Sequence, residues 1–114
     1  MQYLLLLHVE EAGWGQLTAA DQEAAMTAYG AYTQALIDDN ALVANGRLQP
    51  SVDARTVRVK DGRRQVLDGP FAETKEVIGG YYLIEAADEA AAIEWAARCP
   101  ASGHGVIEVR GVAG

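Results

Sequence analysis

The sequence predicts an α+β fold of the ferredoxin-like type, with elements in the order β-α-β-(β-hairpin)-β-α-β. Two apolar stretches, at 2–8 and 77–85, have the length and composition of buried strands, and a helical pattern follows each of them. Between these two strand–helix units, an Asp-Gly pair separates two alternating segments and marks a hairpin. A chain of 114 residues and 12.1 kDa has the size of one domain, so we expect residues 1–114 to form a single domain.

The first strand and helix are expected in the N-terminal third of the chain. Residues 2–8 are apolar without alternation, which predicts a strand that is covered on both faces. A loop around Trp14 is expected at 9–17. The helix should begin at Thr18, whose hydroxyl can cap it, with Asp21 three residues on, and should continue to about residue 39.

The clearest hairpin lies near the middle of the chain, after a short strand at 42–44 and an irregular segment. Strands are expected at 56–60 and 63–67, on either side of Asp61-Gly62. This dipeptide suits a type I′ turn, in which both central residues have positive φ. Such a turn sets a register with two directly opposite pairs: Val57 with Val66, and Arg58 with Gln65.

The C-terminal part of the chain repeats the strand–helix–strand pattern. Residues 72–76 are polar and are expected to form a turn before the strand at 77–85. The paired glycines Gly79-Gly80 indicate a bulge or a close approach of two backbones. Asp88 is expected to cap a helix that ends at Pro100, and the last strand is expected at 106–110.

Apolar side chains on both faces of two strands predict a homodimer. Two helices can cover only one face of a four-stranded sheet. The strands at 2–8 and 77–85 would then leave several hundred Å² of apolar surface exposed, more than most monomers tolerate. We therefore expect two sheets to stack face to face about a two-fold axis. The competing interpretation is that the excursion at 51–76 folds over its own sheet.

Charge and composition exclude several classes of protein. The net charge is −7, which argues against binding to phosphate backbones. Residues 47–64 nevertheless carry a net charge of +4, against −11 for the remainder. These cations form either a solvated hairpin face or a local anion-binding site. There is neither an apolar run of the roughly 20 residues that a membrane span needs nor the basic region of a signal peptide. A single cysteine fits a reducing, cytoplasmic location.

The segment Asp68-Gly-Pro-Phe-Ala-Glu-Thr-Lys-Glu76, followed by Gly79-Gly-Tyr-Tyr-Leu-Ile84, resembles the hallmark of the DGPF branch of the YCII-related family. Supporting pieces, such as Leu48-Gln-Pro50 and Glu94-Trp-Ala96, span the whole chain. The resemblance implies a dimeric α+β barrel of the ferredoxin-like type. It implies no settled activity. Some members of this branch are encoded beside extracytoplasmic-function sigma factors, and more distant YCII-like and muconolactone-isomerase-like proteins are small-molecule enzymes.

One departure from the better-known YCII branch concerns its catalytic residues. That branch carries a helix histidine and an aspartate before a proline, whereas the matching positions here are Tyr29 and Cys99. A tyrosine with a pKa of about 10 is a poor base at neutral pH, and a thiol does not orient an imidazole. The histidine–aspartate mechanism therefore does not carry over to this chain.

The predicted site is a small-molecule pocket between the helical layer and the sheet. Asp68 and His8 are its candidate acid–base residues, with Tyr81 or Tyr82 in the lining and Arg47 at the rim facing an anionic substrate. Two further candidates for ligand binding lie in the loop after the DGPF motif: Glu73 and Lys75.

The class of function stays open between catalysis and regulation. Neither spaced metal ligands nor a Gly-rich phosphate-binding motif is present, so we predict no metal and no cofactor. Catalysis would then be acid–base chemistry of the isomerase or lyase type. The alternative is a non-enzymatic partner of an extracytoplasmic-function sigma factor, as the resemblance implies.

Overall fold

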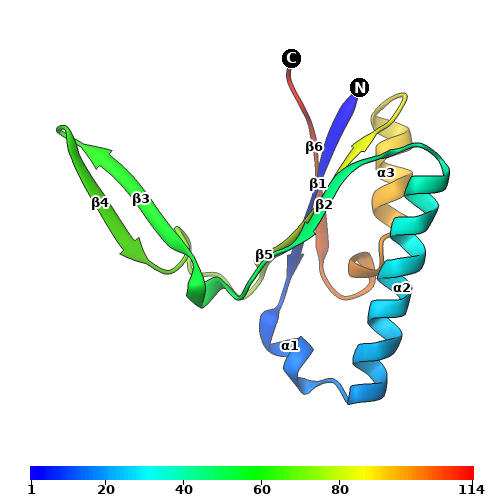
Figure 1. Cartoon of the computed structure of the whole chain (residues 1–114), viewed down its shortest axis with the longest axis horizontal. Coiled ribbons are helices and arrows are strands. Elements are labelled where there is room, and N and C mark those ends of the chain that lie inside the picture. The colour runs from blue at the N-terminus through cyan, green and yellow to red at the C-terminus, as the bar shows by residue number, and fades with distance from the viewer.

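The computed structural model describes residues 1–114 and confirms the predicted α+β, ferredoxin-like fold (Figure 1). A four-stranded antiparallel sheet has the order β2-β5-β1-β6. Its strands are, in chain order, β1 (Gln2–Val9), β2 (Leu42–Arg47), β5 (Val77–Glu85) and β6 (Val106–Gly111). The helices α2 (Ala19–Asp38) and α3 (Glu89–Arg98) cover one face of this sheet (Figure 1). A separate hairpin consists of β3 (Arg55–Lys60) and β4 (Arg63–Asp68).

Both long helices begin at the capping residues that the sequence predicts. The Thr18 hydroxyl accepts a hydrogen bond from the backbone N–H of Asp21 at 3.1 Å. In the same way, Oδ1 of Asp88 accepts from the N–H of Ala91 at 2.9 Å. Each cap satisfies one of the amides that a helix N-terminus leaves without a partner. The helix α2 ends at Asp38, Asp39 is its C-terminal cap, and Asn40, which follows, has a φ of 55°.

Two segments that the sequence describes as irregular are ordered in the structure. The predicted loop at 9–17 contains a short helix, α1 (Glu11–Gln16), so this prediction was wrong. The two carboxylate oxygens of Glu11 hold this helix by accepting from the N–H and the hydroxyl of Ser51, at 2.6 and 2.9 Å. The strand predicted at 42–44 continues to Arg47 as β2, because it pairs with β5 along that length.

Two short 3₁₀ helices complete the chain, η1 (Ser51–Asp53) before the hairpin and η2 (Pro100–Gly103) before the last strand. The predicted hairpin is confirmed. Val57 lies opposite Val66, and Arg58 opposite Gln65. Both turn residues have positive φ, 52° for Asp61 and 72° for Gly62, as a type I′ turn requires.

The core lies between the two long helices and the sheet. Leu5, Leu36 and Ile84 are completely buried there. Next to them, the rings of Tyr32 and Tyr82 meet edge to face, with centroids 5.1 Å apart. The Tyr32 hydroxyl donates to the carbonyl of Trp95 at 2.7 Å, which ties α2 to α3. Burial of these apolar side chains is the main force that holds the helices on the sheet.

The paired glycines produce both effects that the sequence suggests. The register between β1 and β5 shifts between Leu7 and His8, which pair with Gly80 and Ile78, so Gly79 is the extra residue of a bulge. A Cβ at Gly79 would lie 2.6 Å from Cγ2 of Val9. A Cβ at Gly80 would lie 3.0 Å from the carbonyl oxygen of Gly46.

The other face of the sheet has no helix over it. Its apolar side chains alternate with the buried ones along the two central strands, and each is partly exposed: Leu4, Leu6, Tyr81 and Leu83. These four residues define what we call the open face. A single chain therefore presents the uncovered apolar surface that the sequence predicts.

The hairpin β3–β4, with its base at Gly69–Phe71, stands away from the rest of the chain, and we call residues 55–71 the arm. The arm projects from the side of the sheet opposite the helices (Figure 1). The interpretation in which 51–76 fold over their own sheet is therefore wrong. The radius of gyration is 16.0 Å, against about 13 Å expected for a compact domain of this length.

Candidate functional site

The seven site residues predicted from the sequence lie in three separate places. Arg47 and Tyr82 lie on the helix side of the sheet, and His8 and Tyr81 lie on its open face. The remaining three belong to the arm or to the loop that follows it: Asp68, Glu73 and Lys75. The sheet itself separates Tyr82 from His8, so the single shared pocket that the sequence predicts is not present within one chain.

On the helix side, a group of residues around Arg47 lies at the edge of the sheet, and we call it the Arg47 cluster. The Arg47 guanidinium lies 4.8 Å from the ring centroid of Trp14 on α1, close enough for a cation–π contact. It also donates a weak hydrogen bond, at 3.9 Å, to the sulfur of Met26 on α2. None of the ion pairs in the structure includes Arg47. Its charge is thus placed on an aromatic ring and lacks an anion.

Tyr29 completes the Arg47 cluster, with the hydroxyl of Tyr82 behind it. Burial, then the nearby Cys99 and Tyr82, raises the pKa of Tyr29 to about 12, although Arg47 opposes the shift. The Tyr82 hydroxyl lies 2.9 Å from that of Thr33, and burial raises the pKa of Tyr82 as well. Both phenols are therefore neutral at physiological pH, and neither serves as a base there.

On the open face, His8 has a partner that the sequence analysis missed. Nε2 of His8 lies 3.0 Å from Oε1 of Glu108 on β6. The other carboxylate oxygen of Glu108 accepts from Arg110 at 3.2 Å. An imidazole oriented by a carboxylate is the arrangement that general acid–base chemistry uses. Glu108 could have been found from the pairing of the first and last strands in this fold. That pairing places Glu108 opposite Leu6, on the face that also carries His8.

The hydrogen bond from His8, followed by that from Arg110, lowers the pKa of Glu108 below its ordinary value of 4.5. A lowered carboxyl pKa contributes stability that is present above the ordinary value and is lost as the pH falls through the lowered one. We therefore expect Glu108→Gln to reduce the free energy of unfolding slightly at pH 7, with a difference that disappears in acid. Urea unfolding between pH 3 and pH 7 measures this.

Glu94→Gln is the matched control for that series, because Glu94 is exposed on α3 and takes part in none of the ion pairs. It should change the unfolding free energy equally at both ends of the pH range. A Glu108→Gln effect that stayed constant from pH 3 to pH 7 would show that the bond to His8 contributes nothing.

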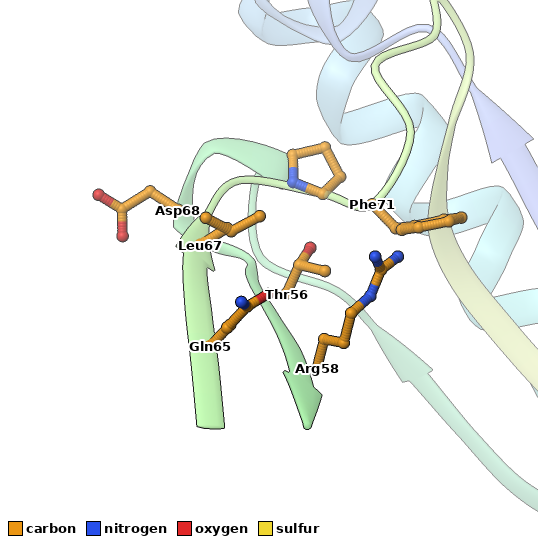
Figure 2. A pocket seen from close by; sticks show the side chains of 7 residues that line it. Thr56, Arg58, Gln65, Leu67, Asp68 and Phe71 are labelled. Atoms are coloured by element: carbon orange, nitrogen blue, oxygen red, sulfur yellow. The ribbon is translucent and has the colours of Figure 1, made fainter. Parts of the chain in front are cut away.

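The arm places Asp68 away from both other groups. Its carboxylate pairs with Arg55 at 3.2 Å and is 91% exposed, so it neither enters the cleft between sheet and helices nor binds the amides that follow. A hollow of about 210 Å³ lies beside it, lined by Arg58, Leu67 and Phe71 among others. Figure 2 shows the Asp68 carboxylate pointing away from the other side chains of this hollow.

The DGPF motif thus forms the base of the arm. Gly69 takes a φ of 93°, which favours glycine, and its N–H donates to the carbonyl of Ala54 at 2.8 Å. Its carbonyl accepts from the Thr56 hydroxyl at 2.9 Å. Phe71, the last residue of the motif, is 81% exposed.

Glu73 and Lys75 follow the motif on the surface. The Lys75 ammonium lies 3.9 Å from a carboxylate oxygen of Glu10, and both side chains are well exposed, so the pair adds little stability. Glu73 lines an open hollow of about 250 Å³ together with Ser51 and Thr74.

No three side chains of the His, Cys, Asp or Glu type are grouped to hold a metal ion. None of the helices combines the length and the apolar character that crossing a bilayer requires.

Comparison with known proteins agrees with this architecture. The model of the YCII-related domain matches residues 1–113. The chain belongs to the YCII-related family. A relative in this family is an uncharacterised protein from Rhizobium meliloti (strain 1021), which is 33% identical over 96 residues. The aligned region covers 84% of this chain and 77% of that protein.

Proposed function

We propose that this chain is a homodimeric, small-molecule-binding member of the DGPF branch, and that its ligand is a small organic carboxylate held in the Arg47 cluster. The observation that carries the proposal is the unpaired guanidinium of Arg47 over the Trp14 ring. Arg58, Arg63, Arg64 and Arg98 also lack an ion pair, but Arg47 lies among the Trp14 ring, Met26 and Tyr29, where the helices meet the edge of the sheet. An arginine fork without a protein partner is suited to two parallel hydrogen bonds with a carboxylate.

The surroundings of Arg47 supply the rest of a binding site. Trp14 and Tyr29 offer aromatic surface for the apolar part of a ligand, and Met26 adds an adaptable side chain. Gly80 lies opposite Arg47 in the sheet and places no side chain beneath it. The α1 segment that carries Trp14 is fixed by Glu11 on Ser51 and by the side-chain amide of Gln22, which donates to the carbonyl of Trp14 at 3.0 Å, so the ring is held beside Arg47.

The same geometry favours binding over catalysis. The group suited to proton transfer, the His8–Glu108 pair, lies on the opposite face of the sheet from Arg47. The tyrosines nearest to Arg47 stay protonated at neutral pH, since burial raises their pKa values. A ligand bound at Arg47 would therefore meet hydrogen-bond donors but no base from the same chain.

Binding of benzoate to two arginine variants tests this proposal. We expect benzoate to bind the native protein and Arg47→Ala to bind it about 10- to 100-fold more weakly, the effect of losing a charged hydrogen-bond pair. Arg98→Ala is the control, because Arg98 also lies over a tryptophan, 4.2 Å from the ring of Trp95, on a different part of the surface. Titration by NMR measures both affinities.

Benzamide, in the same titration, distinguishes the contribution of the ligand's charge to the affinity from that of its ring. It has the shape of benzoate but no charge, so it should bind the native protein more weakly than benzoate does. Equal binding of benzoate and benzamide, or equal loss of benzoate affinity in Arg47→Ala and Arg98→Ala, would contradict a carboxylate site at Arg47.

A further inference from the structure

The arm has too little contact with its own chain to account for its order. Isolated two-stranded hairpins are marginally stable in water, and three strands or a packed face are needed for independent stability. The arm is bonded to the body of the chain only at its base, where the N–H of Gly69 and the guanidinium of Arg55 donate to the carbonyl of Ala54. Neither β3 nor β4 packs on the four-stranded sheet or on a helix.

The arm also exposes more apolar surface than a solvated hairpin needs. Five of its apolar side chains are exposed by half or more: Val57, Val59, Val66, Leu67 and Phe71. Apolar groups gathered in this way mark an interaction surface or an aggregation hazard. The phenylalanine of the DGPF motif is among them, in a position that adds nothing to the fold of its own chain.

The charge of the arm differs in sign from that of the rest of the molecule. The arm, residues 55–71, carries five cations and two acids, whereas the remainder carries four cations and fourteen acids. Two arms would therefore repel each other, and an arm would be attracted to the body of another copy. Opposite charges on two parts of one chain suit a reciprocal contact, in which the arm of each copy lies against the body of the other copy.

The arm points to the same side of the sheet as the open face, so it would lie beside any partner that covers that face. Figure 1 shows the helices on one side of the sheet and the arm on the other. The open face, with Leu4, Leu6, Tyr81 and Leu83, looks toward that same side. A second copy that sits on the open face would meet the arm as well.

We propose that the arm is a clasp for a second copy of this chain: the β3–β4 hairpin and Phe71 of each protomer lie against the body of the other, at the edge of the stacked sheets. The inference rests on the homodimer of the proposed function and adds the surface that secures it. It also gives the DGPF motif a role, since Gly69 sets the direction of the arm and Phe71 supplies an apolar contact.

A shortened arm tests the proposal. Because Arg58 lies opposite Gln65, at a hydrogen-bonded pair like the Lys60–Arg63 pair of the native turn, replacing residues 59–64 by Asn-Gly closes a shorter hairpin and keeps the Arg55–Asp68 pair. Sedimentation equilibrium should show dimer dissociation at a concentration at least tenfold higher than for the native chain. Circular dichroism should be retained, because the residues removed make no contact with the core.

Phe71→Ala is a second variant, and it should leave the fold of a single chain intact because Phe71 is 81% exposed there. It should also weaken the dimer. Its control is Ile93→Ala, which removes a half-exposed apolar side chain from α3, on the far side of the sheet, and should leave association unchanged.

Carbodiimide cross-linking of a dimer made from ¹⁴N- and ¹⁵N-labelled chains locates the arm. We expect mixed-isotope peptides that join Lys60, at the hairpin turn, to carboxylates outside the arm of the other chain. A dimer that is equally stable with the shortened arm, or Lys60 peptides of one isotope only, would overturn the clasp and leave the proposed dimer intact. A monomer at every concentration would overturn both and leave the arm free for a different protein.

Discussion

Replacing Gly105 by alanine is expected to destabilise the protein by about 3 kcal/mol or more. Gly105 lies between η2 and β6, and its N–H donates to the carbonyl of Ala101 at 2.8 Å. A Cβ there would run into the carbonyl oxygen of His8 and would come within 3.3 Å of Cγ1 of Val9. Backbone cannot move aside as a flexible side chain does, so β6 must shift relative to β1. The shift would also disturb the bond between His8 and Glu108.

Gly103→Ala is the control for this substitution. Gly103 lies two residues away, and a Cβ there would meet nothing within 4 Å. It should change the free energy of unfolding by less than about 0.5 kcal/mol. Urea unfolding followed by circular dichroism measures both variants. Similar stabilities for the two alanine variants would mean that the close contact between Gly105 and β1 is not a feature of the folded protein.

Leu36→Ala is expected to cost about 2–5 kcal/mol of unfolding free energy. Leu36 is fully buried on the inner side of α2, among the residues of the core. Truncation removes its apolar contacts and leaves a cavity that neighbouring side chains fill only in part. Because alanine is a good helix former, the change acts on packing rather than on the helix itself.

The neighbouring residue gives the matched control for Leu36. Ile37 is next in the same helix but is 47% exposed, so Ile37→Ala should cost less than about 1 kcal/mol. Thermal unfolding by calorimetry ranks the two variants. A larger loss for Ile37→Ala than for Leu36→Ala would place the core on the other side of α2, contrary to the structure.

The sequence predicts the hairpin and the helix starts in detail because local chemistry determines them. Asp61-Gly62 requires positive φ at two successive residues, and this requirement alone sets the pairing of Val57 with Val66. Thr18 and Asp88 bind amides only three residues away. Interactions of such short range do not depend on where the rest of the chain lies.

The missed elements depend on distant residues. Gly13 and Gly15 weaken the helical propensity of α1, which is held instead by Ser51, 40 residues beyond Glu11. Asn45-Gly46 has the composition of a turn, but it is part of β2 because Tyr82 and Tyr81 of β5 pair with it. Sheet pairing overrides the local preference at these positions.

The candidate site shows the same limit. His8 could be selected from the sequence as a polar residue at a strand end, but Glu108 is 100 residues away and is joined to it only by the pairing of β1 with β6. The position of Asp68 at the end of a strand predicts a place in the cleft, yet that strand, β4, belongs to the arm rather than to the main sheet. Alternation along a strand cannot show which sheet the strand joins.

The site residues are divided between two faces of the sheet and the arm, so ligand binding and association should depend on different residues. Arg47 contacts Trp14 of α1 and Met26 of α2 on the helix side of the sheet, whereas His8 and the arm lie on the side where a second copy is proposed to lie. We therefore expect a change at Arg47 to affect ligand binding without affecting association. A change at the open face or the arm should do the reverse.

The mass of the native chain in solution tests the central claim, that the open face is covered by a second copy. Sedimentation equilibrium at micromolar concentration and neutral pH should give a mass of twice 12.1 kDa. A single species of 12.1 kDa across that range would contradict it, because Leu4, Leu6, Tyr81 and Leu83 would then face water without a partner.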